Sequence, residues 1–231
     1  MKTKTISGTG VPRPVFRPDL SRRSFFKLFG GGIFIFFCTW DPLELLAQPG
    51  QPRRELPTDY NAFLHIDENG MVSGFTGKIE MGQGPITSLT QMLAEELDVA
   101  YDHVDMIMGD TDLCPWDMGT FGSLTTRSFG IPFRLAAAEA RGILLQMGSE
   151  RLGIPVSQLQ VNDGVITDKQ DPKKQVTYGQ LAKGKKIEKY LDKKPDIKPF
   201  SEYKIVGKSY LRKDGMLKVT GQAKYSGFSM I

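Results

Sequence analysis

Apolar and polar residues alternate along two short segments in the first third of the chain, in the pattern of half-buried β-strands. The first segment is AFLHID, residues 62–67, and the second is MVSGFTGKIE, residues 71–80. Between them lies Glu68-Asn69-Gly70, a sequence typical of a tight turn. We therefore expect the two strands to form a hairpin.

The pattern changes to helical spacing directly after the glycine-rich loop GKIEMGQG, residues 77–84. The apolar residues at helical spacing are Ile86, Leu89, Leu93 and Leu97. Pro85 suits the first helical turn, where no N–H donor is needed. The glycines let the backbone come close to a ligand, and the free N–H groups of a helix start favour an anion. For this loop taken alone, a tight turn with nothing bound is the favoured interpretation.

Further along the chain, HVDMIMGDTD, residues 103–112, is expected to form a strand that runs into a polar loop. A long helix is expected from about Pro132 to Leu152. Ala138 and Gly142 are placed on its buried stripe, where small residues allow a neighbouring element to approach closely.

The last third of the chain begins with a hairpin, residues 158–168, that turns at Asp163-Gly164. A short helix over residues 176–184 follows. These elements together predict an α+β body with a mixed sheet and packed helices. From Lys194 to Gly215 the chain is extended and basic, and it closes on a polar, strand-like segment.

A second loop rich in glycines and hydroxyl groups precedes the long helix. Its glycine and hydroxyl residues are Gly119, Thr120, Gly122, Ser123, Thr125, Thr126 and Ser128. Hydroxyls and unpaired N–H groups at a helix start can bind a phosphate or a polar heterocycle. Serine and threonine also cap helices without any ligand, so both interpretations stay open for this loop alone.

The composition excludes some classes of function. The 231 residues carry a net charge of +4, and the lysine-rich stretch, residues 173–198, lacks the interleaved aromatic residues of a nucleic-acid site. Cys38 and Cys114 are the only cysteines and His65 and His103 the only histidines. The positions of these four residues show neither a disulfide framework nor the spacing of metal ligands. We therefore expect that this chain by itself forms no metal site.

The N-terminal segment resembles an export signal. SRRSFFK, residues 21–27, closely resembles the twin-arginine signal, and a thirteen-residue apolar run, residues 28–40, follows it. That run is short for a membrane span and suits a signal's hydrophobic region. We expect residues 1–47 to be the signal, cleaved after Ala47 or kept as a membrane anchor, and residues 48–60 to be a proline-rich linker. The body would then lie in the periplasm or on the outer face of the cytoplasmic membrane.

Four segments of the body together resemble the molybdopterin-binding large subunit of the xanthine dehydrogenase and aldehyde oxidase family, in its exported branch of isoquinoline oxidoreductases and aldehyde dehydrogenases. These segments are GKIEMGQGPITSLTQMLAEEL, GTFGSLTTRS with the helix RLAAAEAR, LQVNDGVI, and KVTGQAKYSG. The resemblance covers nearly all of residues 61–227. It implies a partial molybdopterin-binding domain over residues 61–193, and a segment over residues 194–231 that enters a truncated hammerhead-like domain.

The resemblance also implies a cofactor site. The residues expected to bind a molybdopterin-type molybdenum cofactor are Met81, Gly82, Gln83, Gly84, Gly122, Ser123, Thr125 and Thr126. Family members oxidise aldehydes or N-heterocycles with a catalytic glutamate, and electrons leave through an iron–sulfur subunit. A cytochrome acceptor is a further candidate partner, and the N-terminus is a candidate membrane contact.

The family's catalytic glutamate lies in a segment that this sequence lacks, so no catalytic residue is assigned. Glu80 is expected on a strand, and Glu95 and Glu96 are expected on a solvent-exposed face of a helix. We therefore expect this chain to need a complementary chain that carries the rest of the large subunit. Two alternatives remain: a truncated, inactive remnant, and an exported module that binds some other anion without catalysis.

Overall fold

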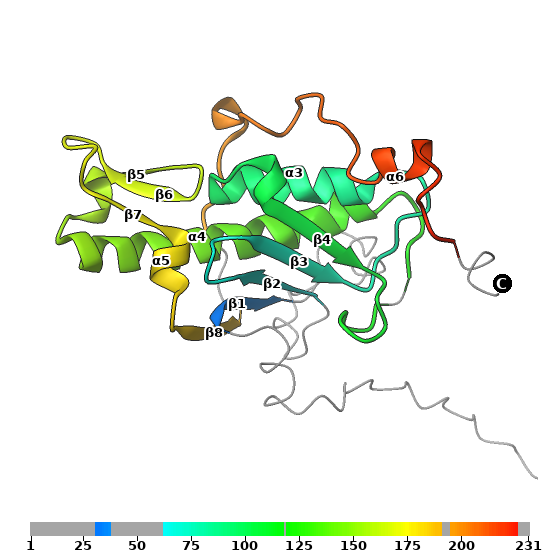
Figure 1. Ribbon diagram of the computed structural model, residues 1–231, viewed down its shortest axis with the longest axis horizontal. Helices are drawn as coiled ribbons and strands as arrows, with labels where there is room; N and C mark the ends of the chain where they lie inside the picture. Colours follow the sequence, from blue (N-terminus) through cyan, green and yellow to red (C-terminus); the bar gives the residue numbers. More distant parts are fainter. Residues whose placement is uncertain (1–30, 38–61, 118, 191–194, 226–231) are drawn as a thin grey trace, which may run out of the picture.

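The computed structural model describes residues 31–37, 62–117, 119–190 and 195–225. Two sheets and four α-helices build the described fold, with the larger sheet below the two long helices in Figure 1. The larger sheet contains, in spatial order, β4 (Val104–Met108), β3 (Val72–Thr76), β2 (Ala62–Ile66), β1 (Gly32–Phe37) and β8 (Lys186–Tyr190). Strand pairs β1–β2 and β2–β3 are antiparallel, whereas β3–β4 and β1–β8 are parallel. The fold is therefore α+β with a mixed sheet, as predicted.

The remaining elements surround this sheet. The α-helices are α3 (Pro85–Leu97), α4 (Gly130–Leu152), α5 (Tyr178–Ala182) and α6 (Gly215–Val219). The smaller sheet contains β5 (Leu159–Asn162), β6 (Val165–Asp168) and β7 (Gln175–Thr177). Single turns η1 (Tyr101–His103), η3 (Val156–Gln158) and η4 (Phe200–Glu202) are 3₁₀-helical, and η2 (Thr125–Phe129), directly before α4, is π-helical.

One apolar core lies between the larger sheet and the helices α3 and α4. Among its fully buried members are Ile33, Ile35, Leu64, Val72, Leu89, Leu93, Phe133 and Leu144. The two helices also pack against each other. Burial of this face stabilises helices that would be marginal as isolated peptides.

Most of the predicted elements are confirmed. Helix α3 starts at Pro85 after Gly84, whose φ of 87° is the left-handed conformation that favours glycine. The β5–β6 hairpin turns at Asp163-Gly164, both with positive φ, as a two-residue hairpin turn requires. Helix α5 starts with a capping box in which Thr177 is the N-cap residue.

The predicted buried stripe of the long helix is wrong at Gly142, although Ala138 is buried. A Cβ added to Gly142 would meet nothing within 4 Å, and that residue is exposed. The close approach is at Gly148 instead, where a Cβ would lie 2.8 Å from Ile166 Cδ1. The alanine-rich sequence is compatible with several stripes, so its periodicity did not select the correct one.

The strand-like segment expected near the end of the chain is also wrong in part, because Lys218 and Val219 belong to the short helix α6. Between β8 and α6, residues 195–214 form an irregular segment, here called the C-terminal arm, which was expected to be extended but includes the single turn η4. It runs along α3 from the C-terminal end of that helix to its N-terminal end (Figure 1). No helix within the described ranges is long and apolar enough to span a membrane.

The predicted export signal falls largely on residues 1–30 and 38–47, which lie outside the described residues. Residues 32–37 of its apolar run form the buried strand β1. Next to β1, His65 is a buried side chain of β2, as expected for a strand residue. Its burial lowers the pKa of the imidazole below the ordinary value of 6.5.

Candidate functional site

The two predicted cofactor loops are joined at their bases by a buried ion pair. Lys78 Nζ lies 2.5 Å from Asp117 Oδ1, and each side chain is only 1% exposed. The ammonium also donates to the Gly119 carbonyl and lies 3.7 Å from the centre of the Phe129 ring. Thr120 adds a second link, because its Oγ1 accepts a hydrogen bond from Ile79 N at 2.9 Å. Residues 77–79 of the first loop are thereby fixed against Asp117, Gly119 and Thr120 of the second.

Gly77 allows this close contact. A Cβ at Gly77 would lie 2.6 Å from Asp117 Cβ and 2.7 Å from Pro115 O, so any larger residue would separate the loops. The first of the three loop glycines therefore has a packing role.

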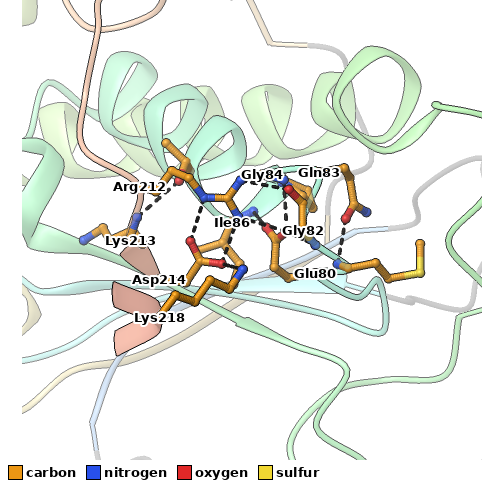
Figure 2. Close-up of polar contacts among 12 residues, drawn as sticks. Glu80, Gly82, Gln83, Gly84, Ile86, Arg212, Lys213, Asp214 and Lys218 are labelled. Carbon is orange, nitrogen blue, oxygen red and sulfur yellow. Dashed lines mark hydrogen bonds and ion pairs between the residues drawn. The ribbon is translucent and has the colours of Figure 1, made fainter. Parts of the chain in front are cut away.

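The N–H groups at the start of α3 bind a carboxylate of the same chain, that of Glu80. Glu80 Oε1 accepts hydrogen bonds from Gly82 N at 2.7 Å and Gly84 N at 3.0 Å, and Oε2 accepts one from Ile86 N at 3.3 Å. Figure 2 shows this carboxylate pointing into the loop. An anion was expected at this helix start, and the structure supplies it internally.

The C-terminal arm contributes a positive charge to the same loop. Arg212 Nη1 donates to Gly82 O at 2.8 Å, and Nη2 lies 3.4 Å from Glu80 Oε1 (Figure 2). Arg212 also forms a two-point ion pair with Asp214, with both N–O distances at 2.9 Å. This guanidinium, with Lys218 beside it, holds the pKa of the Asp214 carboxyl well below its usual range.

Gln83 is exposed at the tip of the first loop. Its Oε1 accepts a hydrogen bond from Met81 N at 2.6 Å, and its Nε2 donates to Ile79 O at 3.3 Å. Met81 is 61% exposed, and a Cβ added to Gly82 would meet nothing within 4 Å. The loop tip therefore presents an amide, a thioether and open space above Gly82.

The second loop presents a different set of groups. Gly122 and Ser123 are exposed and have positive φ, whereas Thr125 is buried within η2. Thr126 is exposed, and its Oγ1 lies 2.7 Å from Ser88 Oγ on α3. Hydroxyls of both elements thus meet beside the start of α3.

These groups suit a polar organic ligand. Gln83 offers a donor and an acceptor, the exposed hydroxyls of Ser123 and Thr126 offer both as well, and Gly82 leaves room for a ring to approach. Within the described part of the chain, no group of three or more histidine, cysteine, aspartate or glutamate residues could hold a metal ion.

Several residues of this region were misplaced or missed by the sequence analysis. Glu80 lies in the loop, because β3 ends at Thr76, and it was predicted on a strand. Glu95 and Glu96 were expected on a solvated face, yet they are 1% and 0% exposed and bind the C-terminal arm and Arg134. The position of Glu80 just before a helix start is a usable signal, since a carboxylate there complements the helix dipole. The partners of Lys78 and Glu95 are distant in sequence and give no local signal.

Comparison with known proteins identifies a family for this chain. The family model of the molybdopterin cofactor-binding domain matches residues 29–225. One nicotinate dehydrogenase chain from Pseudomonas putida is 36% identical over 184 residues, which cover 80% of this chain and 15% of that protein. The beta chain of isoquinoline 1-oxidoreductase from Brevundimonas diminuta is 27% identical over 205 residues, which cover 71% of this chain and 26% of that protein.

Solved structures are similar over a smaller part of the chain. The reconstituted CO dehydrogenase from Oligotropha carboxidovorans matches 52% of this chain and 15% of that one, with 28% identity and a TM-score of 0.47. The chain thus spans only a fraction of the length of its curated relatives.

Proposed function

The chain belongs to the molybdopterin cofactor-binding domain family, and we propose that it forms one part of the cofactor site of a molybdenum hydroxylase that oxidises aldehydes or N-heterocycles. The observation that carries this proposal is the pair of loops that Lys78 and Asp117 join, with the exposed Gln83 amide at one tip. The cofactor, when bound, supplies the oxygen-transfer and redox chemistry. This chain supplies binding and positioning.

We assign specific roles to the loop residues. The Gln83 amide donates to and accepts from the edge of the pterin ring, next to the open space over Gly82. Ser123 and Thr126 offer hydroxyls to the pterin or its phosphate. Thr125 is buried in η2, so its role is to hold the shape of the second loop. The residues that shape the approach to the cofactor are Met81, Gly82, Gly84 and Gly122.

The hydrogen bonds of Glu80 favour this proposal over the alternative of an anion-binding module. The N–H groups of Gly82, Gly84 and Ile86, in the loop and at the start of α3, already bind the Glu80 carboxylate, and Arg212 balances its charge. A free anion would have to displace an internal anion from this position. The first loop is therefore better suited to a polar ring contacted by a side chain than to a phosphate bound by the backbone.

The proposed assembly has several chains. The nicotinate and isoquinoline enzymes named above are each known as proteins of more than one chain, as is the 6-hydroxypseudooxynicotine dehydrogenase complex of Paenarthrobacter nicotinovorans, whose gamma chain is another relative. We infer that this chain shares its cofactor with a complementary chain that carries the catalytic glutamate. An iron–sulfur subunit then receives the electrons, with a cytochrome as a candidate acceptor.

We expect the purified chain alone to have no hydroxylase activity, because none of its described residues is assigned as the catalytic base. Co-expression with a complementary chain of the family should give a complex that contains molybdenum and pterin and reduces a dye with an aldehyde or N-heterocycle. Metal analysis, pterin fluorescence and dye reduction measure these properties.

Two results would contradict this expectation. Dye reduction by the chain alone, lost on molybdenum depletion, would place a complete active site in it. A correctly folded chain that never joins a complementary chain or retains molybdenum would favour the inactive remnant.

We also propose export by the twin-arginine route, motivated by SRRSFFK before the apolar run. Replacing Arg22 and Arg23 with lysine keeps the charge but removes the guanidinium pair, so it should abolish export of a reporter fused after residue 60. The linker offers a matched control in Arg53 and Arg54, a second adjacent pair. Their replacement by lysine should leave the periplasmic reporter unchanged. Undiminished export of the Arg22→Lys/Arg23→Lys reporter would refute the proposed route.

A further inference from the structure

The apolar run of the N-terminal segment has a second structural use. Residues 32–37 form strand β1, which lies between β2 and β8 and pairs with both. Its register against β2 joins Ile33 to Ile66 and Phe37 to Ala62. Without β1, the strand β8 would lose its partner in the larger sheet, and β2 would become an edge.

Side chains of β1 are buried on both faces of the sheet. Ile33, Ile35 and Phe37 belong to the core beneath the helices, and Phe37 meets the Phe133 ring of α4 edge to face at 4.9 Å. On the other face, Phe34 and Phe36 join a second apolar cluster. None of these five side chains is more than 4% exposed.

The start of β1 fits its neighbours only as glycine. Gly32 has a φ of 135°, and a Cβ there would collide with the Ile66 carbonyl and the His65 ring. A Cβ at Gly31 would lie 2.5 Å from Glu68 Oε1. Gly32 N donates to Lys185 O at 2.8 Å, and His65 Nε2 lies 3.2 Å from Gly31 O. Glycine is thus required at position 32 by its backbone conformation as well as by its neighbours.

We propose that β2 and β8 form an acceptor site for the chain's own N-terminal apolar segment, and that residues 32–37 stay in the finished protein as an inner strand. The segment can serve export only while it is undocked, because its apolar side chains are buried once the strand forms. Cleavage after Ala47 would remove the strand, so the finished protein keeps its N-terminal segment.

Paired cysteines test the docked strand in the full-length chain, in a background with Cys38→Ser and Cys114→Ser. Two in-register pairs are suitable, Phe36→Cys with Phe63→Cys and Ile35→Cys with Leu64→Cys. Directly opposed residues of antiparallel strands have Cα atoms about 4.5 or 5.5 Å apart, within the range of a disulfide.

The matched control is Ile33→Cys with Ala62→Cys, two core residues at opposite ends of the pairing, about 13 Å apart along the strand. After mild oxidation of protein purified from cells, we expect at least about tenfold more crosslinked chain for an in-register pair than for the control.

Intact mass of the unmodified protein gives a second readout that does not depend on the folding of any variant. We expect a mass that includes residues 32–37. A chain that begins after Ala47, or folded in-register variants that crosslink no more than the control, would overturn the inference.

Discussion

Replacing Lys78 with methionine is expected to lower the free energy of unfolding by about 3–5 kcal/mol, which is a large share of the stability of an ordinary domain. The ammonium of Lys78 is the counter-charge of a buried carboxylate, that of Asp117. Among the described residues, Asp117 Oδ2 has no hydrogen-bond partner. Loss of the lysine would leave that carboxylate buried, with Gly119 N still donating to Oδ1 at 2.8 Å.

Denaturant unfolding of the full-length chain measures this effect. The double variant Lys78→Met/Asp117→Asn removes both charges and should recover part of the loss, because no uncompensated charge remains. Lys183→Met, at an exposed position, is the control and should change stability by within about 0.5 kcal/mol. If Lys78→Met lowers the free energy of unfolding by no more than the control does, the two loops are not joined by this ion pair.

Replacing Glu95 with alanine should cost on the order of 3 kcal/mol of stability and release the C-terminal arm. Glu95 Oε2 accepts hydrogen bonds from the backbone N–H groups of Ile205 at 2.6 Å and of Val206 and Lys204 at 2.9 Å. A hydrogen bond to a charged group contributes about 1.5–3 kcal/mol, so loss of this set outweighs the loss of an ordinary bond. Release of the arm would also withdraw Arg212 from the Gly82 carbonyl.

Limited proteolysis and amide hydrogen exchange of residues 198–212 distinguish this local release from general unfolding. Glu95→Gln keeps one acceptor oxygen, so the exchange rates of its arm should lie between those of the parent and those of Glu95→Ala. Glu150→Ala, at an exposed position on α4, is the matched control and should leave the arm protected. Unchanged exchange of the arm in Glu95→Ala would mean that other contacts, such as that of Lys198 with Asp98, suffice to hold it.

Local periodicity was enough to predict several elements. The β2–β3 hairpin, helix α3 and the β5–β6 turn follow from apolar spacing and from glycine at turn positions. The ends of elements were less accurate: β3 stops at Thr76, so Glu80 enters the loop and binds the start of α3. A short apolar run bounded by glycines is compatible with a buried strand as well as with a signal, and periodicity alone could not choose between them for β1.

The contacts that shape the candidate site were beyond local reasoning. Lys78 and Asp117 are 39 residues apart, and Glu95 is 109 residues from Lys204. A sequence does not distinguish a charged residue that becomes buried from one that stays exposed to solvent, because only the fold brings the partner of the buried residue close to it. For Glu95 and Glu96 the helical pattern indicated an exposed face. The C-terminal arm covers that face, and because the arm is irregular, its own sequence shows no pattern that predicts this contact.

Gln83→Ala, in the complex reconstituted with a complementary chain, tests the central claim most directly. Loss of one buried hydrogen bond to the pterin should cost on the order of 1–3 kcal/mol of cofactor affinity, or roughly 5- to 150-fold. The stability of the chain should change by within about 0.5 kcal/mol, because Gln83 is exposed and its side chain hydrogen-bonds to its own loop. Gln146→Ala, an exposed glutamine on α4, is the matched control.

The measurement is the molybdenum and pterin content of each complex over a range of cofactor concentrations. We predict that Gln83→Ala loses cofactor at concentrations that saturate the parent and Gln146→Ala, with all three equally stable. Equal cofactor content in all three complexes would contradict the proposed contact and leave the glycine-rich loop as a turn closed by Glu80.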